Sequence, residues 1–170
     1  LGIDLVITDH HECKSELPQA IALVDPHRKD QPQPVTEMAG VGVAFKLAAA
    51  IEGEQETLLD QYCDFLCLGT VADVMPLTGE NRTMVARGLK ALENPRRVGI
   101  AALMAECSVQ KGPVTAGTIG YTLAPRINAA GRMGEVGIAT ELFLTHDAGR
   151  AVELAGALCR LNRRRQEIES

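Results

Sequence analysis

The sequence predicts an α/β fold in which a parallel sheet is flanked by helices and followed by a long helix at the end of the chain. Two short apolar runs, 3–8 and 21–24, lack the alternation of a half-exposed strand. Continuous apolar runs of this length are typical of strands buried on both faces of a parallel sheet. Helical spacing of apolar residues dominates elsewhere, so helices should supply the flanking layers.

The first half of the chain continues with a loop and two helices. Three prolines lie among charged and amide residues in 26–34, which predicts a surface loop. A run of small residues opens a predicted helix over 39–51, and apolar residues at helical spacing predict another over 58–68. The pattern then changes, which predicts a short extended segment over 69–76 that bears Asp73.

The second half of the chain is predicted to be mostly helical. A turn at 78–81 precedes a helix over 84–92, and two short helices are expected over 98–106 and 115–123. The last amphipathic stretch begins near Asp147, a suitable N-cap, and runs to the end of the sequence. It has no stop signal, so we expect this helix to continue into a further segment.

Length and composition limit the class of protein. The 170 residues, 46% of them hydrophobic, suffice for one domain with a buried core. Charges interrupt every apolar window, so no membrane span is predicted. The first residues are already strand-like and no initiator Met or basic leader precedes them. We therefore expect the sequence to be a piece of a longer protein.

Cysteine usage and charge restrict the compartment and the partners. The five cysteines include no pair at zinc-knuckle spacing, and Cys63 and Cys67 lie one helical turn apart in an apolar segment. This pattern predicts reduced core thiols and a reducing cytoplasm. The formal net charge of -5 argues against a globally basic nucleic-acid binder. A carboxylate-rich metal site is also acidic before its cations bind, so a polynucleotide substrate stays open.

The candidate chemistry lies where the first predicted strand ends. Asp9, His10 and His11 follow the strand directly, and Asp73 leaves a second apolar run among small neighbours. Parallel sheets place their functional groups at the carboxyl ends of strands, and imidazole with carboxylate suits manganese, zinc or iron. Two such ions can assist phosphoester hydrolysis. Four ligands are too few for two metals, so we expect further ligands upstream.

Seven segments, in unbroken order along nearly the whole chain, carry a family resemblance. They are VITDHH at 6–11, AGVGVAFK at 39–46, GTVADV at 69–74, GENR at 79–82, PRINAAGR at 125–132, LN at 161–162 and RQEIE at 165–169. With them the chain resembles the DHH phosphoesterase superfamily and, within it, the RecJ type of single-strand-specific 5' to 3' DNA exonuclease.

The resemblance implies roles for four residues. His10 would bind a catalytic manganese, and Asp73 would bind or bridge the ions. His11 would contact the scissile phosphate, and Asp9 would orient a histidine, as carboxylates do for metal-bound imidazoles. The resemblance further implies two Mn²⁺ or Mg²⁺ ions in the complete protein. It implies a partial DHH catalytic domain over 1–146, without its earlier aspartate motifs, and the start of an interdomain linking helix over 147–170. This piece alone should be inactive.

The implied function is hydrolysis of single-stranded DNA to mononucleotides from a 5' end, in DNA repair and recombination in the cytoplasm. A helicase or a single-strand-binding protein would be a partner, and the oligomeric state is open. One alternative is a DHH phosphodiesterase that cleaves short oligonucleotides or a cyclic dinucleotide. Another is a noncatalytic DHH-like scaffold that binds DNA. A third is a plain α/β domain in which the Asp-His-His triplet is structural.

A second cluster of polar residues occupies the segment 125–132. Its proline, glycine and alanines predict a tight loop that brings Arg126, Arg132 and the Asn128 amide toward a phosphate. The alternative is a surface loop held by arginine–carboxylate pairs, and the family order favours substrate contact. Three further polar residues, Asn81, His27 and His146, are interpreted as capping or surface residues, with a substrate role for Asn81 as the alternative.

Overall fold

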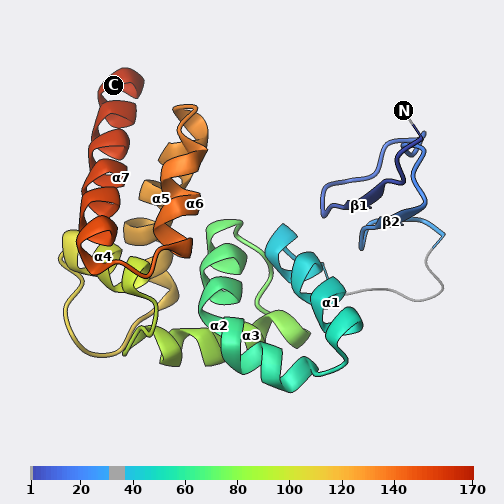
Figure 1. Cartoon of the computed structure of the whole chain (residues 1–170), viewed down its shortest axis with the longest axis horizontal. Coiled ribbons are helices and arrows are strands. Elements are labelled where there is room, and N and C mark those ends of the chain that lie inside the picture. The colour runs from blue at the N-terminus through green and yellow to red at the C-terminus, as the bar shows by residue number, and fades with distance from the viewer. Residues whose placement is uncertain (1, 31–36) are drawn as a thin grey trace. The chain divides into compact units, whose positions relative to one another are not determined.

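A computed structural model of the chain describes residues 2–30 and 37–170 (Figure 1). The chain divides into two compact units, Leu1–Gly88 and Leu89–Ser170. Residues 31–36 of the predicted proline-rich loop lie outside the described residues. No helix in the described part of the chain is both long enough and apolar enough to cross a membrane. The α/β class is confirmed, although most elements are helices.

The sheet of the first unit consists, in the described residues, of β1 (Val6–Thr8) and β2 (Ala22–Val24), which pair in parallel. Their positions match the two predicted strands, but within this chain the strands are not buried on both faces. Val6 is 54% exposed and Ile21, just before β2, is 69% exposed. Burial on both faces requires covering layers, and this two-stranded sheet leaves apolar side chains exposed to solvent. Apolar runs alone do not reveal whether such layers are present.

Two packed helices follow in the same unit, α1 (Gly40–Glu52) and α2 (Gln55–Ala72). The predicted extended segment from Gly69 onward was wrong, because α2 continues through Ala72 and Asp73 is its C-cap. A Cβ on Gly69 would lie 2.6 Å from Cγ1 of Val41 in α1. The glycine therefore permits close approach of two helices and does not end α2.

Helix α3 (Gly79–Leu92) spans the boundary of the two units and begins earlier than predicted. The predicted turn at 78–81 is largely its first turn. Gly88 in α3 packs so closely on α2 that a Cβ there would lie 2.2 Å from both the Cys63 carbonyl oxygen and the Cys67 Cβ. Both cysteines are buried free thiols, as predicted. Burial raises the pKa of Cys67 to about 12.

The second unit is helical throughout its described residues. Its elements are α4 (Val98–Glu106), a π-helical turn η1 (Thr118–Leu123), α5 (Ala124–Arg132), α6 (Val136–Leu144) and α7 (Ala148–Glu169). Helices α4, α5 and α6 all pack on α7 (Figure 1). Fully buried leucines and isoleucines fill the space between them: Ile100, Leu103, Ile119, Leu123, Leu142 and Leu158. Helix α6 was not predicted. The predicted division of the chain at residue 146 stays a prediction.

The segment 125–132 is helix α5, so the predicted tight loop was wrong. Pro125 occupies the first turn of α5, where a missing backbone N–H is tolerated. The preceding turn is π-helical, a local widening that commonly accommodates irregularities within a helix. Proline at this position is therefore compatible with a continuous helical path.

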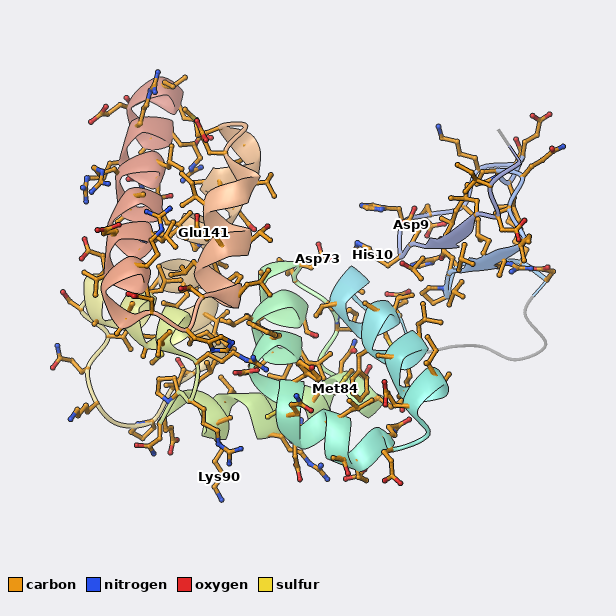
Figure 2. All side chains as sticks on the ribbon, viewed as in Figure 1. Asp9, His10, Asp73, Met84, Lys90 and Glu141 are labelled. Carbon is orange, nitrogen blue, oxygen red and sulfur yellow. The ribbon has the colours of Figure 1, made fainter. Side chains whose placement is uncertain are left out.

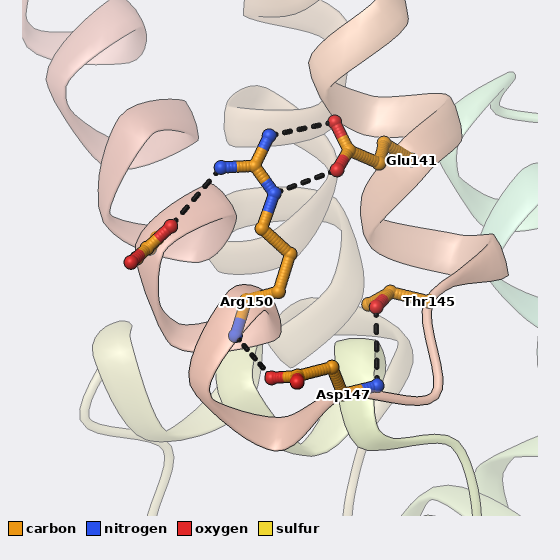
Figure 3. Close-up of polar contacts among 5 residues, drawn as sticks. Glu141, Thr145, Asp147 and Arg150 are labelled. Atoms are coloured by element: carbon orange, nitrogen blue, oxygen red, sulfur yellow. Dashed lines mark hydrogen bonds and ion pairs between the residues drawn. The ribbon is translucent and has the colours of Figure 1, made fainter.

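The predicted N-cap of the last helix is confirmed (Figure 3). The Asp147 carboxylate accepts a 2.7 Å hydrogen bond from the Arg150 backbone N–H. The Arg150 guanidinium in turn donates two hydrogen bonds to Glu141 in α6, at 2.6 and 2.8 Å. These bonds hold the pKa of the Glu141 carboxyl below its usual value. The cap and this ion pair together fix the connection between α6 and α7.

Replacing Asp147 with alanine should lower the free energy of unfolding by about 1 kcal/mol, because a backbone donor of α7 loses its partner. Asp147→Asn is the matched control, since the asparagine oxygen can still accept that hydrogen bond and should keep stability near wild type. Urea unfolding followed by circular dichroism measures both. Equal stability of the two variants would show that the cap contributes nothing.

Candidate metal centre

The Asp-His-His triplet follows β1 at the carboxyl edge of the parallel pair. Asp9 continues the ladder by one bond, because its N–H donates to the Val24 carbonyl at 3.0 Å. The chain then leaves the sheet, and residues 10–13 belong to neither a helix nor a strand. This is the sheet edge at which functional groups gather in parallel α/β folds.

Asp9 organises the triplet through its carboxylate. One oxygen, Oδ1, accepts hydrogen bonds from the backbone N–H of His10 at 2.8 Å and of His11 at 3.4 Å. The same oxygen lies 2.8 Å from Nδ1 of the His11 ring. The His11 hydrogen bond, with the His10 backbone bond second, lowers the pKa of Asp9, and the Asp9 bond raises the pKa of His11. Asp9 thus fixes the orientation of an imidazole that is 77% exposed.

His10 turns away from solvent toward the helices of its unit (Figure 2). Its side chain is 18% exposed, and Nδ1 lies 3.3 Å from Oδ2 of Asp73 at the end of α2. The ring also lies against the start of α1, where a Cβ on Gly40 would be 3.3 Å from Cδ2 of His10. The absence of a side chain at Gly40 therefore makes room for the ring. The side chains of His10 and Asp73 thus meet although sixty-odd residues separate them in the sequence.

These residues form a donor set that fits a divalent transition ion. Asp9, His10 and His11 can each offer one ligand atom, and those atoms lie within 4.8 Å of one another. Asp73 adds a carboxylate beside His10. Within the part of the chain that the structure describes, no other group of three or more such side chains could hold a metal. Mixed imidazole and carboxylate donors suit manganese, whereas Mg²⁺ prefers oxygen ligands.

Comparison with known proteins agrees with this arrangement. A family model described as "DHH family, N-terminal domain" matches residues 1–70. The single-stranded-DNA-specific exonuclease RecJ of Bacillus subtilis (strain 168) is 42% identical over 170 residues, which cover 100% of this chain and 21% of that protein. RecJ of Escherichia coli (strain K12) is 36% identical, over 99% of this chain and 32% of its own length.

The first 70 residues thus match the DHH family, and the whole chain is similar to RecJ proteins. A crystal structure of RecJ from Thermus thermophilus in complex with Mn²⁺ matches with a TM-score of 0.85 and 38% identity, over 99% of this chain and 25% of that one. The crystal structure of the same RecJ in complex with Mg²⁺ matches with a TM-score of 0.70 and 40% identity. This match covers 83% of this chain and 22% of that one. The chain spans about a fifth to a third of the length of the two RecJ relatives from Bacillus subtilis and Escherichia coli.

The other predicted site residues lie in α5 of the second unit. Nη1 of Arg126 donates to the Thr122 carbonyl at 2.9 Å, and the side chain is half-buried. Asn128 and Arg132 are exposed and four residues apart, so they share one face of α5. Nη1 of Arg132 lies 4.0 Å from Glu169. Arg126 and Arg132 lie six residues apart in α5, so their side chains leave different faces of the helix, and the expected contact of both guanidiniums with one phosphate stays a prediction.

Two interpretations of single residues were also wrong. Asn81 is not a helix cap: its buried Nδ2 donates to the carbonyls of Glu37 and Pro76, at 2.7 and 3.0 Å. His27 is not a free surface residue, because its Nδ1 lies 3.5 Å from the Glu12 carboxylate and its side chain is 20% exposed. Its place just after the second strand was the signal that sequence reasoning overlooked.

Proposed function

We propose that the protein containing this chain is a metal-dependent, single-strand-specific DNA exonuclease that releases mononucleotides from a 5' end. The observation that carries the proposal is the meeting of His10 with Asp73, beside Asp9 and His11. Similarity to RecJ proteins along the whole chain supports the substrate class. The function would serve DNA repair and recombination.

In this proposal His10 and Asp73 hold Mn²⁺ or Mg²⁺, with two ions in the complete site. Manganese-bound RecJ structures support the choice of metal. The chemistry supplied by bound ions would be acidification of the attacking water and neutralisation of phosphoryl charge. Asp9 holds Nδ1 of His11, which leaves Nε2 of that ring for a phosphoryl oxygen of the substrate. A donor fixed before the reaction stabilises developing charge without a reorganisation cost.

We place Arg126, Asn128 and Arg132 in substrate binding. Asn128 and Arg132 are exposed on one face of α5, where an amide and a guanidinium can both donate to backbone phosphates. The bond to Thr122 uses one of the five N–H donors of Arg126, so the others remain for a phosphate. These contacts would position DNA without reading its sequence.

Replacing Arg132 with alanine should raise the DNA concentration needed for half-maximal rate and leave kcat within about twofold, because uniform binding is lost. The salt dependence of binding should also become shallower. Arg87→Ala is the control, since this arginine pairs with Glu56 and Asp60 and has no proposed contact with DNA. Steady-state kinetics at two salt concentrations measure the effect. Unchanged kinetics would remove Arg132 from the substrate site.

The proposed activity is tested with the full-length protein and single-stranded DNA labelled at either end. With Mn²⁺ and without chelator, label at the 5' end should be released first as a mononucleotide. Binding without cleavage would instead indicate a noncatalytic scaffold. Cleavage confined to dinucleotide-sized or cyclic dinucleotide substrates would indicate a small-substrate phosphodiesterase.

We also propose a cytoplasmic location and single-stranded DNA as the principal partner. The cysteines of the chain are free thiols, which is the usual state in a reducing compartment. A helicase or a single-strand-binding protein would supply or present the single strand. Co-purification of the full-length protein with either partner from an extract treated with nuclease tests for a direct contact, because DNA can then no longer bridge the two proteins.

A further inference from the structure

A second carboxylate occupies the same sheet edge as the Asp-His-His triplet. Thr8 pairs with Val24 in the parallel register, so the residues that follow, Asp9 and Asp25, leave the sheet side by side. Asp25 is 4% exposed. A carboxylate buried to this extent requires hydrogen bonds, and those of Asp25 involve the loop that carries the triplet.

Asp25 has one hydrogen-bond partner before it in the sequence, Cys13, and one after it, His27. Its Oδ1 accepts a 2.8 Å hydrogen bond from the His27 backbone N–H. The Cys13 thiol forms a side-chain hydrogen bond with the same carboxylate. Asp25 therefore ties the end of the triplet loop, at Cys13, to the segment after β2.

His27 supplies a further tie one residue away. Its Nδ1 lies 3.5 Å from Oε1 of Glu12, and its backbone is fixed by Asp25. The segment 25–27 thus contacts the loop 9–13 at Glu12 and Cys13, while the ladder bond from Asp9 to Val24 secures the start of that loop. Both ends of the loop are held by the strand end beside it.

Such ties matter because the loop has no secondary structure of its own beyond residue 9. The His11 side chain is largely exposed, and its ring is held by a hydrogen bond to the Asp9 carboxylate. Ligands of a metal must be held within a fraction of an ångström for activity, and the groups that hold them are nearly as important as the ligands.

We propose that Asp25 and His27 are positioning residues that hold the loop 9–13 so that His10 and His11 keep their place in the metal centre. The proposal rests on the proposed metal-dependent hydrolysis. In this proposal both residues act through their contacts with Glu12 and Cys13.

The test compares Asp25→Ala, Asp25→Asn and His27→Ala in the full-length protein. Asp25→Ala should weaken Mn²⁺ binding in calorimetry and lower kcat, each by roughly 10- to 100-fold, with KM for DNA nearly unchanged. His27→Ala should give a smaller loss of the same kind. Asp25→Asn should restore most of both losses, because its oxygen can still accept from the His27 N–H. Asp30→Ala is the control, since that exposed carboxylate pairs with Arg28 outside the segment.

Wild-type Mn²⁺ affinity and kcat in all three variants would overturn the proposal. A higher KM for DNA with unchanged Mn²⁺ affinity and kcat would overturn it too, because DNA binding and not the position of the loop would then be affected. If Asp25→Ala does not fold, His27→Ala still decides the matter by the same two readouts. Failure of the proposed function is distinguishable: the wild-type protein would then bind Mn²⁺ without cleaving DNA, and calorimetry on the variants would still measure positioning.

Discussion

Replacing His10 with alanine is expected to reduce Mn²⁺-dependent hydrolysis of single-stranded DNA by roughly 1,000-fold or more, the scale seen when one member of a catalytic unit is removed. The imidazole lies 3.3 Å from Asp73 and against Gly40, so alanine removes the nitrogen donor that lies beside this carboxylate. The rate of nucleotide release by the full-length protein at saturating Mn²⁺ measures the loss.

The matched control is His146→Ala, which removes an exposed imidazole from the connection between α6 and α7 and should leave the rate unchanged. Circular dichroism and thermal melting of both variants separate loss of activity from loss of fold. His10 contributes little to a hydrophobic core, so the melting temperature should change by a few degrees at most. Wild-type hydrolysis by His10→Ala would remove His10 from the proposed metal centre.

Replacing Gly99 with alanine is expected to cost about 3 kcal/mol of stability or more, the upper range for overpacking a core. The added Cβ would lie 1.8 Å from the Leu142 carbonyl oxygen and 2.8 Å from its carbon. Backbone atoms cannot rotate away as a side chain can, so α4 and α6 must separate. Both helices pack on α7 around side chains that are almost fully buried, including Ile100 and Leu142.

Gly137→Ala provides the comparison within α6, because a Cβ at that position meets nothing within 4 Å. It should leave stability equal or raise it by up to ~1 kcal/mol, since alanine favours the helix over glycine. Urea unfolding of the purified proteins measures both changes. If Gly99→Ala were as stable as Gly137→Ala, the close contact between α4 and α6 would not exist.

The sequence predicted those features that depend on local signals. The strand that ends at Thr8, the helix opened by small residues near Gly40, and the Asp147 cap all follow from residue type and spacing within a few positions. The Asp-His-His triplet could be placed at a sheet edge for the same reason. Local rules suffice where the structure is decided by neighbours in sequence.

Features that depend on distant partners could not be predicted. Gly69 resembled a helix breaker, and only the position of Val41 in another helix reveals it as a close-packing site. Pro125 indicated a loop, yet a π-helical turn places it in the first turn of α5. The burial of the strands and the tie between His27 and Glu12 likewise depend on what lies beside them in space.

The most direct test of the central claim is a crystal of the full-length protein soaked in Mn²⁺, with diffraction data collected at the manganese absorption edge. We expect an anomalous peak coordinated by an imidazole nitrogen of His10 and a carboxylate oxygen of Asp73. A manganese peak that touches neither residue, or no peak beside them at saturating Mn²⁺, would contradict it.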